Sequence, residues 1–230
     1  MISLVIPLYN EEGNIRPLVD SIVELIIKKK WDSEIVLVDD NSNDQTAEIV
    51  DNYSKKYDFI VPLHRGQEKK GMGFALIEGT KKANGDIIIW TMGDNSDDIN
   101  TYHKLINKIN EGYDMVFAAR YIKGGSRGNL DLFKTFLSSG YSKIASLWYG
   151  TNLHDITNAF RAFKKNVFEK CNLKSGDFAI SPEFAIKAHL NGFKLGEVPT
   201  TYTNRKKGKS KFKLIDMGIK YISLFKLRMR

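Results

Sequence analysis

"DIIIWTMGDNSDD", residues 86–98, joins an apolar run to a group of carboxylates. Its first part, from Ile87 to Trp90, is continuously apolar, which is typical of a strand buried on both faces of a parallel sheet. Asp94, Asp97 and Asp98 follow directly. Ligands of such sheets bind beyond the carboxyl ends of the strands. The stretch therefore predicts a central strand and, just beyond it, the edge of the sheet that carries a binding site.

Strands and helices alternate through the first half of the chain. Runs of strand type lie at residues 2–8, 34–40, 59–64, 86–92 and 113–121. Segments with apolar residues at helical spacing lie between them, at residues 11–29, 43–57, 71–83 and 99–110. Asn43 or Asp44 is the expected N-cap of the second helix. The alternation predicts an α/β fold with a mostly parallel central sheet and helices on both faces.

The second half of the chain is less regular. The patterns predict helices at 132–150 and 181–193, a loop, short strand and helix within 155–171, a strand at 194–205 and a terminal helix at 213–230. No internal repeat or low-complexity linker divides these segments. We therefore expect one domain over residues 1–212, with a basic amphipathic C-terminal helix over residues 213–230 as an appendage.

Positive charge is concentrated at the C-terminal end. The formal net charge is +8, but residues 204–230 hold ten basic residues and one acid, whereas the remainder holds 25 basic and 26 acidic residues. The end therefore carries +9 and the remainder −1. Such a basic end attracts phosphates, anionic lipid or nucleic acid.

Other features narrow the class of protein. No run of about 18 apolar residues is present, so we expect no membrane-spanning helix. The first ten residues read as a strand rather than as a signal peptide. A single cysteine, Cys171, cannot form an internal disulfide and suits a reducing compartment. The four histidines are scattered without the spacing of metal ligands.

Polar side chains follow several predicted strands and converge at one edge of the sheet. Asp39 offers hydrogen-bond acceptors for a base or a ribose, and Tyr9 offers a stacking face. Asp94 offers oxygen to a hard divalent cation of the kind that bridges diphosphate oxygens. Gly71 and Gly73 lack a third glycine and follow the third strand, so we expect no Rossmann dinucleotide site. The simplest shared ligand is a nucleoside diphosphate conjugate.

Six motifs follow one another in the order and spacing of a known family. They are VIPLYNEEGNI, EIVLVDDNSNDQT, GMGFALIEGTKKANGDIIIWTMGDNS, AARYIKGG, DITNAFRAFKKNVF and RKKGKSKF. From Ile2 to about Lys213 the chain resembles family 2 glycosyltransferases, most of all the branch of dolichol-phosphate mannose synthases and polyprenyl-phosphate glycosyltransferases. The resemblance implies the GT-A fold of nucleotide-diphospho-sugar transferases.

The resemblance also implies roles on the donor side. The residues that would hold the nucleotide of the sugar donor are Pro7, Tyr9, Glu11 and Asp39, with Lys70 and Gly71 lying along it. Asp94 would be the second aspartate of the family's Asp-x-Asp motif and would bind Mg²⁺ or Mn²⁺. Met92 stands in place of the first aspartate and offers no oxygen to such a hard ion. A neighbouring aspartate, water or the donor phosphates would then complete the metal's coordination.

On the acceptor side, the resemblance assigns a lipid phosphate to three cations, Arg120, Lys134 and Arg205. Asp155 and Arg161 match a segment that usually reads D-x-T-S-G-F-R, although Asn158 and Ala159 replace its small residue and glycine. The expected catalytic set is Asp94, Arg120, Asp155 and Arg205. The rival roles are a structural ion pair for Arg120, a loop anchor for Arg161 and a solvated surface around Arg205.

The chemistry of the acceptor decides which of these residues matter most. A lipid phosphate is anionic near neutral pH, so it attacks the anomeric carbon without a strong base and needs positioning and charge neutralisation. A neutral hydroxyl acceptor needs a base, for which Asp155 is the best candidate. We therefore expect an inverting enzyme that moves a hexose from a nucleotide-diphosphate sugar to a polyprenyl phosphate at the cytoplasmic face of a membrane.

Two alternatives stay open. One is a glycan-directed enzyme of the same family that acts in cell-surface polysaccharide synthesis. The other is a non-catalytic, degenerate transferase fold that binds a nucleotide sugar or a membrane-protein partner. Nucleic-acid binding is disfavoured, because the basic end lacks interleaved stacking aromatics and the acidic loops repel phosphate backbones. The terminal helix either packs on the domain or lies at a membrane surface.

Overall fold

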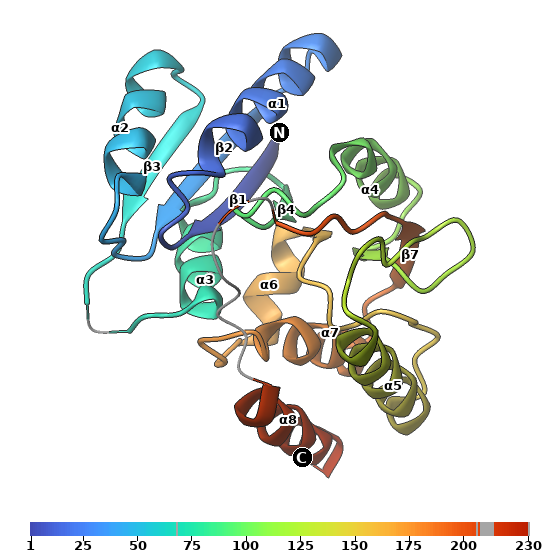
Figure 1. Ribbon diagram of the computed structural model, residues 1–230. Helices are drawn as coiled ribbons and strands as arrows, with labels where there is room; N and C mark the ends of the chain where they lie inside the picture. The colour runs from blue at the N-terminus through green and yellow to red at the C-terminus, as the bar shows by residue number, and fades with distance from the viewer. Residues whose placement is uncertain (68, 206, 208–213, 230) are drawn as a thin grey trace.

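The computed structural model describes residues 1–67, 69–205, 207 and 214–229. These residues form one seven-stranded sheet with the strand order β3-β2-β1-β4-β6-β5-β7 (Figure 1). The strands are β1 (Ile2–Leu8), β2 (Ser33–Asp39), β3 (Ile60–His64), β4 (Ile87–Trp90), β5 (Met115–Ala119), β6 (Arg161–Lys164) and β7 (Leu195–Pro199). Neighbouring strands are parallel except that β6 runs antiparallel to both β4 and β5. The prediction of a mostly parallel sheet is confirmed.

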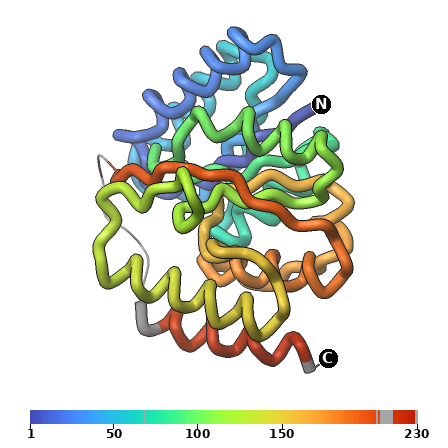
Figure 2. The backbone as a smooth tube through the Cα atoms, turned by 90° about the vertical axis from the view of Figure 1, so that its right-hand side faces the viewer, coloured from blue at the N-terminus to red at the C-terminus, as the bar shows by residue number. Residues whose placement is uncertain are grey.

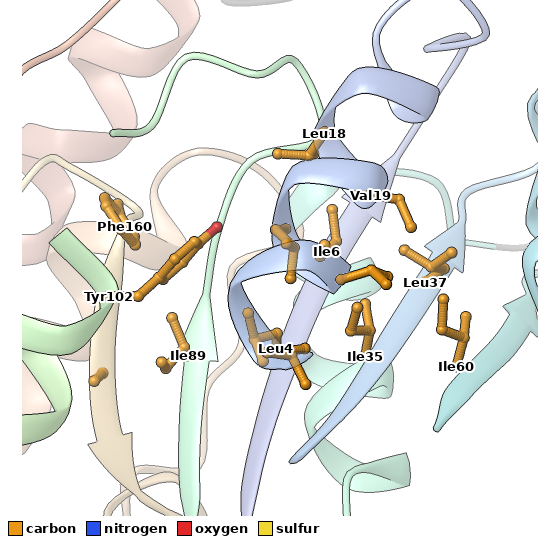
Figure 3. Close-up of a cluster of buried hydrophobic side chains, with 14 of the residues drawn as sticks. Leu4, Ile6, Leu18, Val19, Ile35, Leu37, Ile60, Ile89, Tyr102 and Phe160 are labelled. Carbon is orange, nitrogen blue, oxygen red and sulfur yellow. The ribbon is translucent and has the colours of Figure 1, made fainter. Parts of the chain in front are cut away.

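Helices cover both faces of this sheet (Figure 1). They are α1 (Ile15–Lys29), α2 (Thr46–Lys56), α3 (Met72–Lys82), α4 (Tyr102–Asn110), α5 (Leu132–Tyr149), α6 (Lys165–Cys171), α7 (Ile180–Leu190) and α8 (Leu214–Ser223), with short 3₁₀ helices η1 (Ile99–Thr101) and η2 (Leu224–Met229). Side chains of β1 alternate between two apolar clusters, as the period of a strand requires. Leu4 and Ile6 belong to a cluster with side chains of α1 and α4 (Figure 3) and of α2, whereas Val5 belongs to a cluster with α3, α6 and α7.

One local prediction is wrong. Helix α2 begins at Thr46 with Gln45 as its N-cap, one residue beyond Asp44. The Asp44 carboxylate accepts hydrogen bonds from the backbone N–H groups of Thr46, the first residue of α2, at 3.0 Å and of Glu12 at 3.2 Å, so it joins the start of α2 to the loop after β1. The terminal segment is helical, with α8 ending at Ser223 and a 3₁₀ helix following it.

The terminal helices lie alongside α5 (Figure 2). The rings of Tyr141 and Tyr221 are 4.7 Å apart, and the Tyr141 hydroxyl donates to the carbonyl oxygen of Tyr221. Leu224 is buried against Tyr149 of α5 and Ile186 of α7. One side of the terminal segment is therefore packed on the domain.

Two glycines within helices give a matched test of packing. A Cβ at Gly79 in α3 would lie 2.5 Å from Val5 Cγ1 and 2.6 Å from Val38 Cγ2, whereas one at Gly140 in α5 would meet nothing within 4 Å. We expect Gly79→Ala to lower the free energy of unfolding by about 1–2 kcal/mol, because overpacking outweighs the better helix propensity of alanine. Gly140→Ala should raise it by about 0.5–1 kcal/mol. Urea unfolding of both variants checks this, and equal shifts would contradict it.

Candidate active site

The binding edge of the sheet lies where β1, β2 and β4 end. Because β1 lies between β2 and β4, the loops that follow these strands are neighbours. The loop after β4 approaches β1 closely: a Cβ at Gly93 would come within 2.5 Å of Leu8 Cδ2 and 2.7 Å of the carbonyl oxygen of Pro7. Glycine at position 93 thus lets the aspartate-rich loop lie directly against the end of the first strand.

An arginine joins two carboxylates at this edge. Arg205 Nη2 donates to Asp94 Oδ2 at 2.7 Å, and its Nη1 lies 3.5 Å from Glu11 Oε1. Glu11 also accepts a hydrogen bond from Asn14 Nδ2 at 2.6 Å. Burial raises the pKa of Glu11, and its contacts with Asn14 and Arg205 oppose that rise. The structure therefore brings together three of the predicted site residues, Glu11, Asp94 and Arg205.

The other two aspartates of the 86–98 stretch hold the loop itself. Asp97 Oδ2 accepts from the backbone N–H of Met92 at 2.8 Å and from a neighbouring threonine hydroxyl at 2.9 Å. Asp98 caps η1 by accepting from the backbone N–H of Asn100 at 2.9 Å. Asp94 is thus the aspartate of this stretch that pairs with a distant cation. In the described part of the chain, no three His, Cys, Asp or Glu side chains gather as metal ligands.

The position of Asp97 predicts a dependence of stability on pH. Burial raises the pKa of Asp97 to about 7, so between about pH 4 and pH 7 the folded state keeps a proton that the unfolded state has released. The free energy of unfolding should therefore fall as pH rises through this window. From pH 5 to pH 8, we expect the wild type to lose roughly 2 kcal/mol more than Asp97→Asn. Urea unfolding in EDTA measures both, and parallel pH dependences would refute the prediction.

Asp39, at the end of β2, is held from two sides. Its Oδ1 accepts from the backbone N–H of Ser42 at 3.2 Å, and its Oδ2 lies 3.4 Å from His64 Nδ1. The other ring nitrogen of His64 lies 2.9 Å from Asp51 Oδ1. Burial lowers the pKa of His64, but its hydrogen bonds with Asp51 and Asp39 outweigh burial and raise it. His64, which the sequence patterns did not single out, orients the carboxylate predicted to contact the nucleoside.

The neighbouring Asp40 fastens the loop after β3. One of its oxygens pairs with Arg65, and the other accepts from the backbone N–H of Gly71 at 2.7 Å. Gly71 has a φ of +139°, and a Cβ there would lie 2.2 Å from the carbonyl oxygen of Gly176. A glycine is therefore required at position 71. The adjacent aspartates Asp39 and Asp40 were the sequence signal for this second carboxylate. The sequence pattern did not indicate that Arg65, 25 residues away, is the partner of Asp40.

Arg120 and Asp155 form a second charged pair, at the end of β5. Arg120 Nε lies 2.7 Å from Asp155 Oδ2, and its Nη2 lies 2.8 Å from Oδ1. Asp155 is 0% exposed, and its backbone N–H donates to Glu197 at 2.9 Å. Burial disfavours the charge of Arg120, but Asp155 outweighs burial and raises the pKa of Arg120 above its ordinary value. Asp155 therefore fixes the orientation of this guanidinium group.

Arg161 has the loop-anchoring role. It is 0% exposed and lies against the rings of Trp90 and Phe117. Its guanidinium group donates to the carbonyl oxygens of Ala159 at 3.2 Å and Ser181 at 2.8 Å. Burial lowers its pKa to about 9. Arg161 thus ties the preceding loop and α7 to the sheet.

Tyr202 lies within the electrostatic influence of both charged groups, and the sequence patterns did not predict it. The segment after β7 pairs with the aspartate loop, with a bridge between Asp97 and Tyr202. Burial raises the pKa of Tyr202, and the charges of Asp94, Arg205 and Arg120 all act on it. Its position in the TYTNR segment, just before a predicted phosphate-binding arginine, was the available signal.

Four predicted donor and acceptor residues keep their roles as predictions. Pro7 is buried in β1 and Tyr9, just beyond it, is half-buried. Lys70 precedes α3, and Lys134 lies in the first turn of α5, where both are exposed. Among the described residues, the ion pairs of the site include neither lysine.

Comparison with known proteins identifies relatives. The family model described as Glycosyl transferase family 2 matches residues 3–171. The dolichol-phosphate mannosyltransferase of Pyrococcus furiosus is 33% identical over 214 residues, which are 92% of this chain and 59% of that protein. This chain thus spans less than two thirds of that relative. The polyprenol monophosphomannose synthase of Mycolicibacterium smegmatis is 28% identical over 94% of this chain and 86% of that protein.

Solved structures share the fold. Glucosyl-3-phosphoglycerate synthase from Mycobacterium tuberculosis, crystallised with Mg²⁺ and UDP, matches with a TM-score of 0.72 at 17% identity, over 99% of this chain and 79% of that one. A crystal of the same protein with Mn²⁺, UDP and phosphoglyceric acid gives a TM-score of 0.71 at 18% identity, over 99% and 78%. The expected GT-A fold is confirmed.

Proposed function

The chain belongs to glycosyl transferase family 2, and from this premise we propose that it is an inverting hexosyltransferase acting on a polyprenyl phosphate. Its donor is a nucleotide-diphosphate sugar. The names of two relatives, a dolichol-phosphate mannosyltransferase and a polyprenol monophosphomannose synthase, support this choice of acceptor.

The pair of Arg120 and Asp155 is the observation that carries the proposal. Both oxygens of the Asp155 carboxylate contact the Arg120 guanidinium group, and Asp155 is fully buried. A carboxylate held in this way orients a cation and is poorly placed to take a proton from a hydroxyl group. Because Asp155 occupies the Nε and Nη2 edge of the guanidinium group, a phosphate would be met by the remaining nitrogen, Nη1, which the pair holds in a fixed direction. The site therefore favours a lipid phosphate over a glycan hydroxyl as acceptor.

In the proposed reaction, the attacking group is a phosphate oxygen that is already ionised. One oxygen of the acceptor phosphate bonds to the anomeric carbon while the bond from that carbon to the nucleoside diphosphate breaks, which inverts the anomeric centre. No proton has to leave the attacking oxygen. The work of the chain is to align the two anionic groups and to balance their charge, for which we propose Arg120, Lys134 and Arg205.

On the donor side, Asp39 and Tyr9 would contact the nucleoside and Glu11 would lie beside the diphosphate. The oxygen of Asp94 suits a divalent cation, because it already faces a positive group, the Arg205 guanidinium. Asp94 would hold that ion, and Met92 would add no ligand. When bound, Mg²⁺ or Mn²⁺ supplies charge stabilisation to the leaving diphosphate.

Helices α5 and α8 lie side by side (Figure 2), and both carry exposed apolar side chains. They are Leu132, Phe133, Phe136, Ile144, Leu147 and Trp148 on α5, and Ile219 and Ile222 on α8. Exposed basic residues, including Lys134 and Lys143, lie among them. In the part of the chain that the structure describes, no helix combines the length and apolar character needed to cross a membrane. We propose that this apolar and basic surface binds the cytoplasmic face of a membrane, where the lipid acceptor resides.

A triple variant tests this surface. We expect Phe136→Ser with Ile144→Ser and Leu147→Ser to weaken binding to vesicles of anionic phospholipid about a hundredfold, because three apolar side chains no longer enter the interface. Ile27→Ser removes an equally exposed apolar side chain from α1 and should change binding less than twofold. Vesicle co-sedimentation measures both, and equal binding of the triple variant and the wild type would argue against the surface.

The transferase proposal is tested with radiolabelled donors. GDP-mannose, UDP-glucose, UDP-galactose and UDP-N-acetylhexosamines are each incubated with the protein, Mn²⁺ and a polyprenyl phosphate, and the organic-extractable label is counted. The matched control is the same polyprenol without its phosphate. We expect one donor to label the phosphate and none to label the alcohol. Label in the polyprenol control would overturn the acceptor assignment, and the absence of label from every donor would contradict the transferase proposal.

A non-catalytic nucleotide-sugar-binding protein is the second candidate. Met92 in the metal motif and Arg205 on Asp94 favour it, because both reduce the negative charge available to a metal ion. It predicts tight nucleotide binding with no transfer from any donor.

A further inference from the structure

The segment after β7 crosses the binding edge of the sheet (Figure 2). We call residues 200–205 and 207 the strap. Its backbone is fastened at three loops: Tyr202 N–H donates to the Ser126 carbonyl at 2.9 Å, Thr203 N–H donates to the Ser96 carbonyl at 3.0 Å, and Asn14 Nδ2 donates to the Lys207 carbonyl at 3.1 Å. The strap therefore passes over the loops that follow β5, β4 and β1.

The strap delivers one charged side chain to the candidate metal ligand. The Arg205 side chain is 23% exposed, and it forms ion pairs across the edge with Asp94 and Glu11. The second oxygen of Asp94 accepts from the backbone N–H of Ser96 at 3.2 Å, which leaves Oδ2, the oxygen contacted by Arg205, as the one that faces the site.

We propose that Arg205 is the resident counter-charge of Asp94 and that a divalent cation binds by displacing it. This inference rests on the proposed function, because it assigns a regulatory role to the same site. An ion coordinated at about 2.1 Å by Asp94 Oδ2 would lie close to the guanidinium nitrogen that is 2.7 Å from the same oxygen, so the two cations repel each other and compete for this carboxylate.

The exchange has a consequence for the order of events. An ion that binds without donor breaks the ion pair of Arg205 with Asp94 at 2.7 Å, whereas the contact of Arg205 with Glu11, at 3.5 Å, is longer and compensates less. When a diphosphate is present, the displaced guanidinium can pair with its oxygens. Ion and donor should therefore each strengthen the binding of the other, and the ion alone should bind weakly.

Mn²⁺ affinity in the absence of donor tests the exchange directly. Isothermal titration of the wild-type chain and of Arg205→Gln should show about three- to tenfold tighter Mn²⁺ binding by the variant, the size expected when a half-buried ion pair no longer competes. Lys207→Gln is the matched control, because it removes an exposed charge from the same strap without touching Asp94. It should change Mn²⁺ affinity less than twofold.

Asp94→Asn, alone and with Arg205→Gln, shows whether the measured ion is the one at Asp94, and both should reduce binding to the non-specific level. Unchanged or weaker Mn²⁺ binding by Arg205→Gln overturns the proposal, and so does an equal gain in Lys207→Gln or the absence of binding in all variants. No sugar or lipid enters this experiment. Tighter Mn²⁺ binding by Arg205→Gln, together with no sugar transfer in the donor assay, would contradict the proposed function but support the exchange of Arg205 for the ion.

Discussion

Asp94→Ala should lower the rate of sugar transfer at least about a thousandfold. Asp94 is nearly buried in the loop after β4, and its Oδ2, which pairs with Arg205, is the oxygen proposed to hold the divalent cation beside the diphosphate. Loss of that oxygen removes charge stabilisation that is needed most as the donor bond breaks. Initial rates at saturating donor and Mn²⁺ measure the effect. Asp94→Asn, which keeps an acceptor for the Ser96 N–H, checks that the loss is not a failure of folding.

Asp98→Ala is the matched control in the same loop. Asp98 caps η1 and faces its own backbone, so its loss should cost about 1 kcal/mol of stability and change the transfer rate less than threefold. Equal activity of Asp94→Ala and the wild type would remove the metal site from the mechanism. A comparable loss in both variants would show that the shape of the loop matters rather than a ligand.

Local patterns predict the helices and strands of both halves of the chain, but they do not predict where the short strand of the second half lies in the sheet. Apolar runs such as Ile2–Leu8 carry enough β-branched residues to form buried strands, and the helices between them require right-handed parallel connections. The short strand β6 is different. Its four residues, Arg161–Lys164, are inserted between β4 and β5 against the direction of both. Nothing local specifies that position, because it is fixed by the burial of Arg161 between Trp90 and Phe117.

The sequence predicted which loops form the candidate site, but it did not predict which side chains pair with one another there. The rule that ligands bind beyond the carboxyl ends of strands located Asp39 and Asp94. It could not distinguish Asp94 from Asp97, which are the same residue type three positions apart. Their roles differ because Asp97 turns back to the Met92 N–H, whereas Asp94 meets Arg205, 111 residues further along the chain. A partner so distant in the sequence can be identified only from the three-dimensional structure, in which the strap brings Arg205 to Asp94.

The ion pair between Asp155 and Arg120 changes the interpretation of the residues proposed to bind the acceptor. In the sequence, Asp155 was a candidate base for a hydroxyl acceptor and Arg120 a candidate phosphate ligand, and both roles were open. In the structure the two groups form one unit, with Glu197 behind it. A unit of this kind positions a positive charge, which is what a phosphate acceptor requires.

Arg120→Lys should therefore lower kcat/KM for polyprenyl phosphate about a hundredfold and leave nucleotide affinity within about twofold. Lysine keeps the positive charge beside Asp155, so that carboxylate is not left buried without a partner, but it loses the planar fork that fixes two contacts at once. Steady-state kinetics over a range of acceptor concentrations and a thermal shift with nucleotide and Mn²⁺ measure the two effects. Lys123→Met, an exposed residue of the same loop, should change neither.

Asp155→Asn separates the two roles of the pair. If Asp155 only orients Arg120, its asparagine variant should resemble Arg120→Lys in size and keep the acidic limb of the pH–rate profile. If Asp155 is a base, the variant should lose far more activity, about ten-thousandfold, and that limb should disappear. The first result is the one expected for an acceptor whose attacking oxygen is already ionised. The second result, a far larger loss with no acidic limb, would favour a hydroxyl acceptor and therefore the glycan-directed alternative.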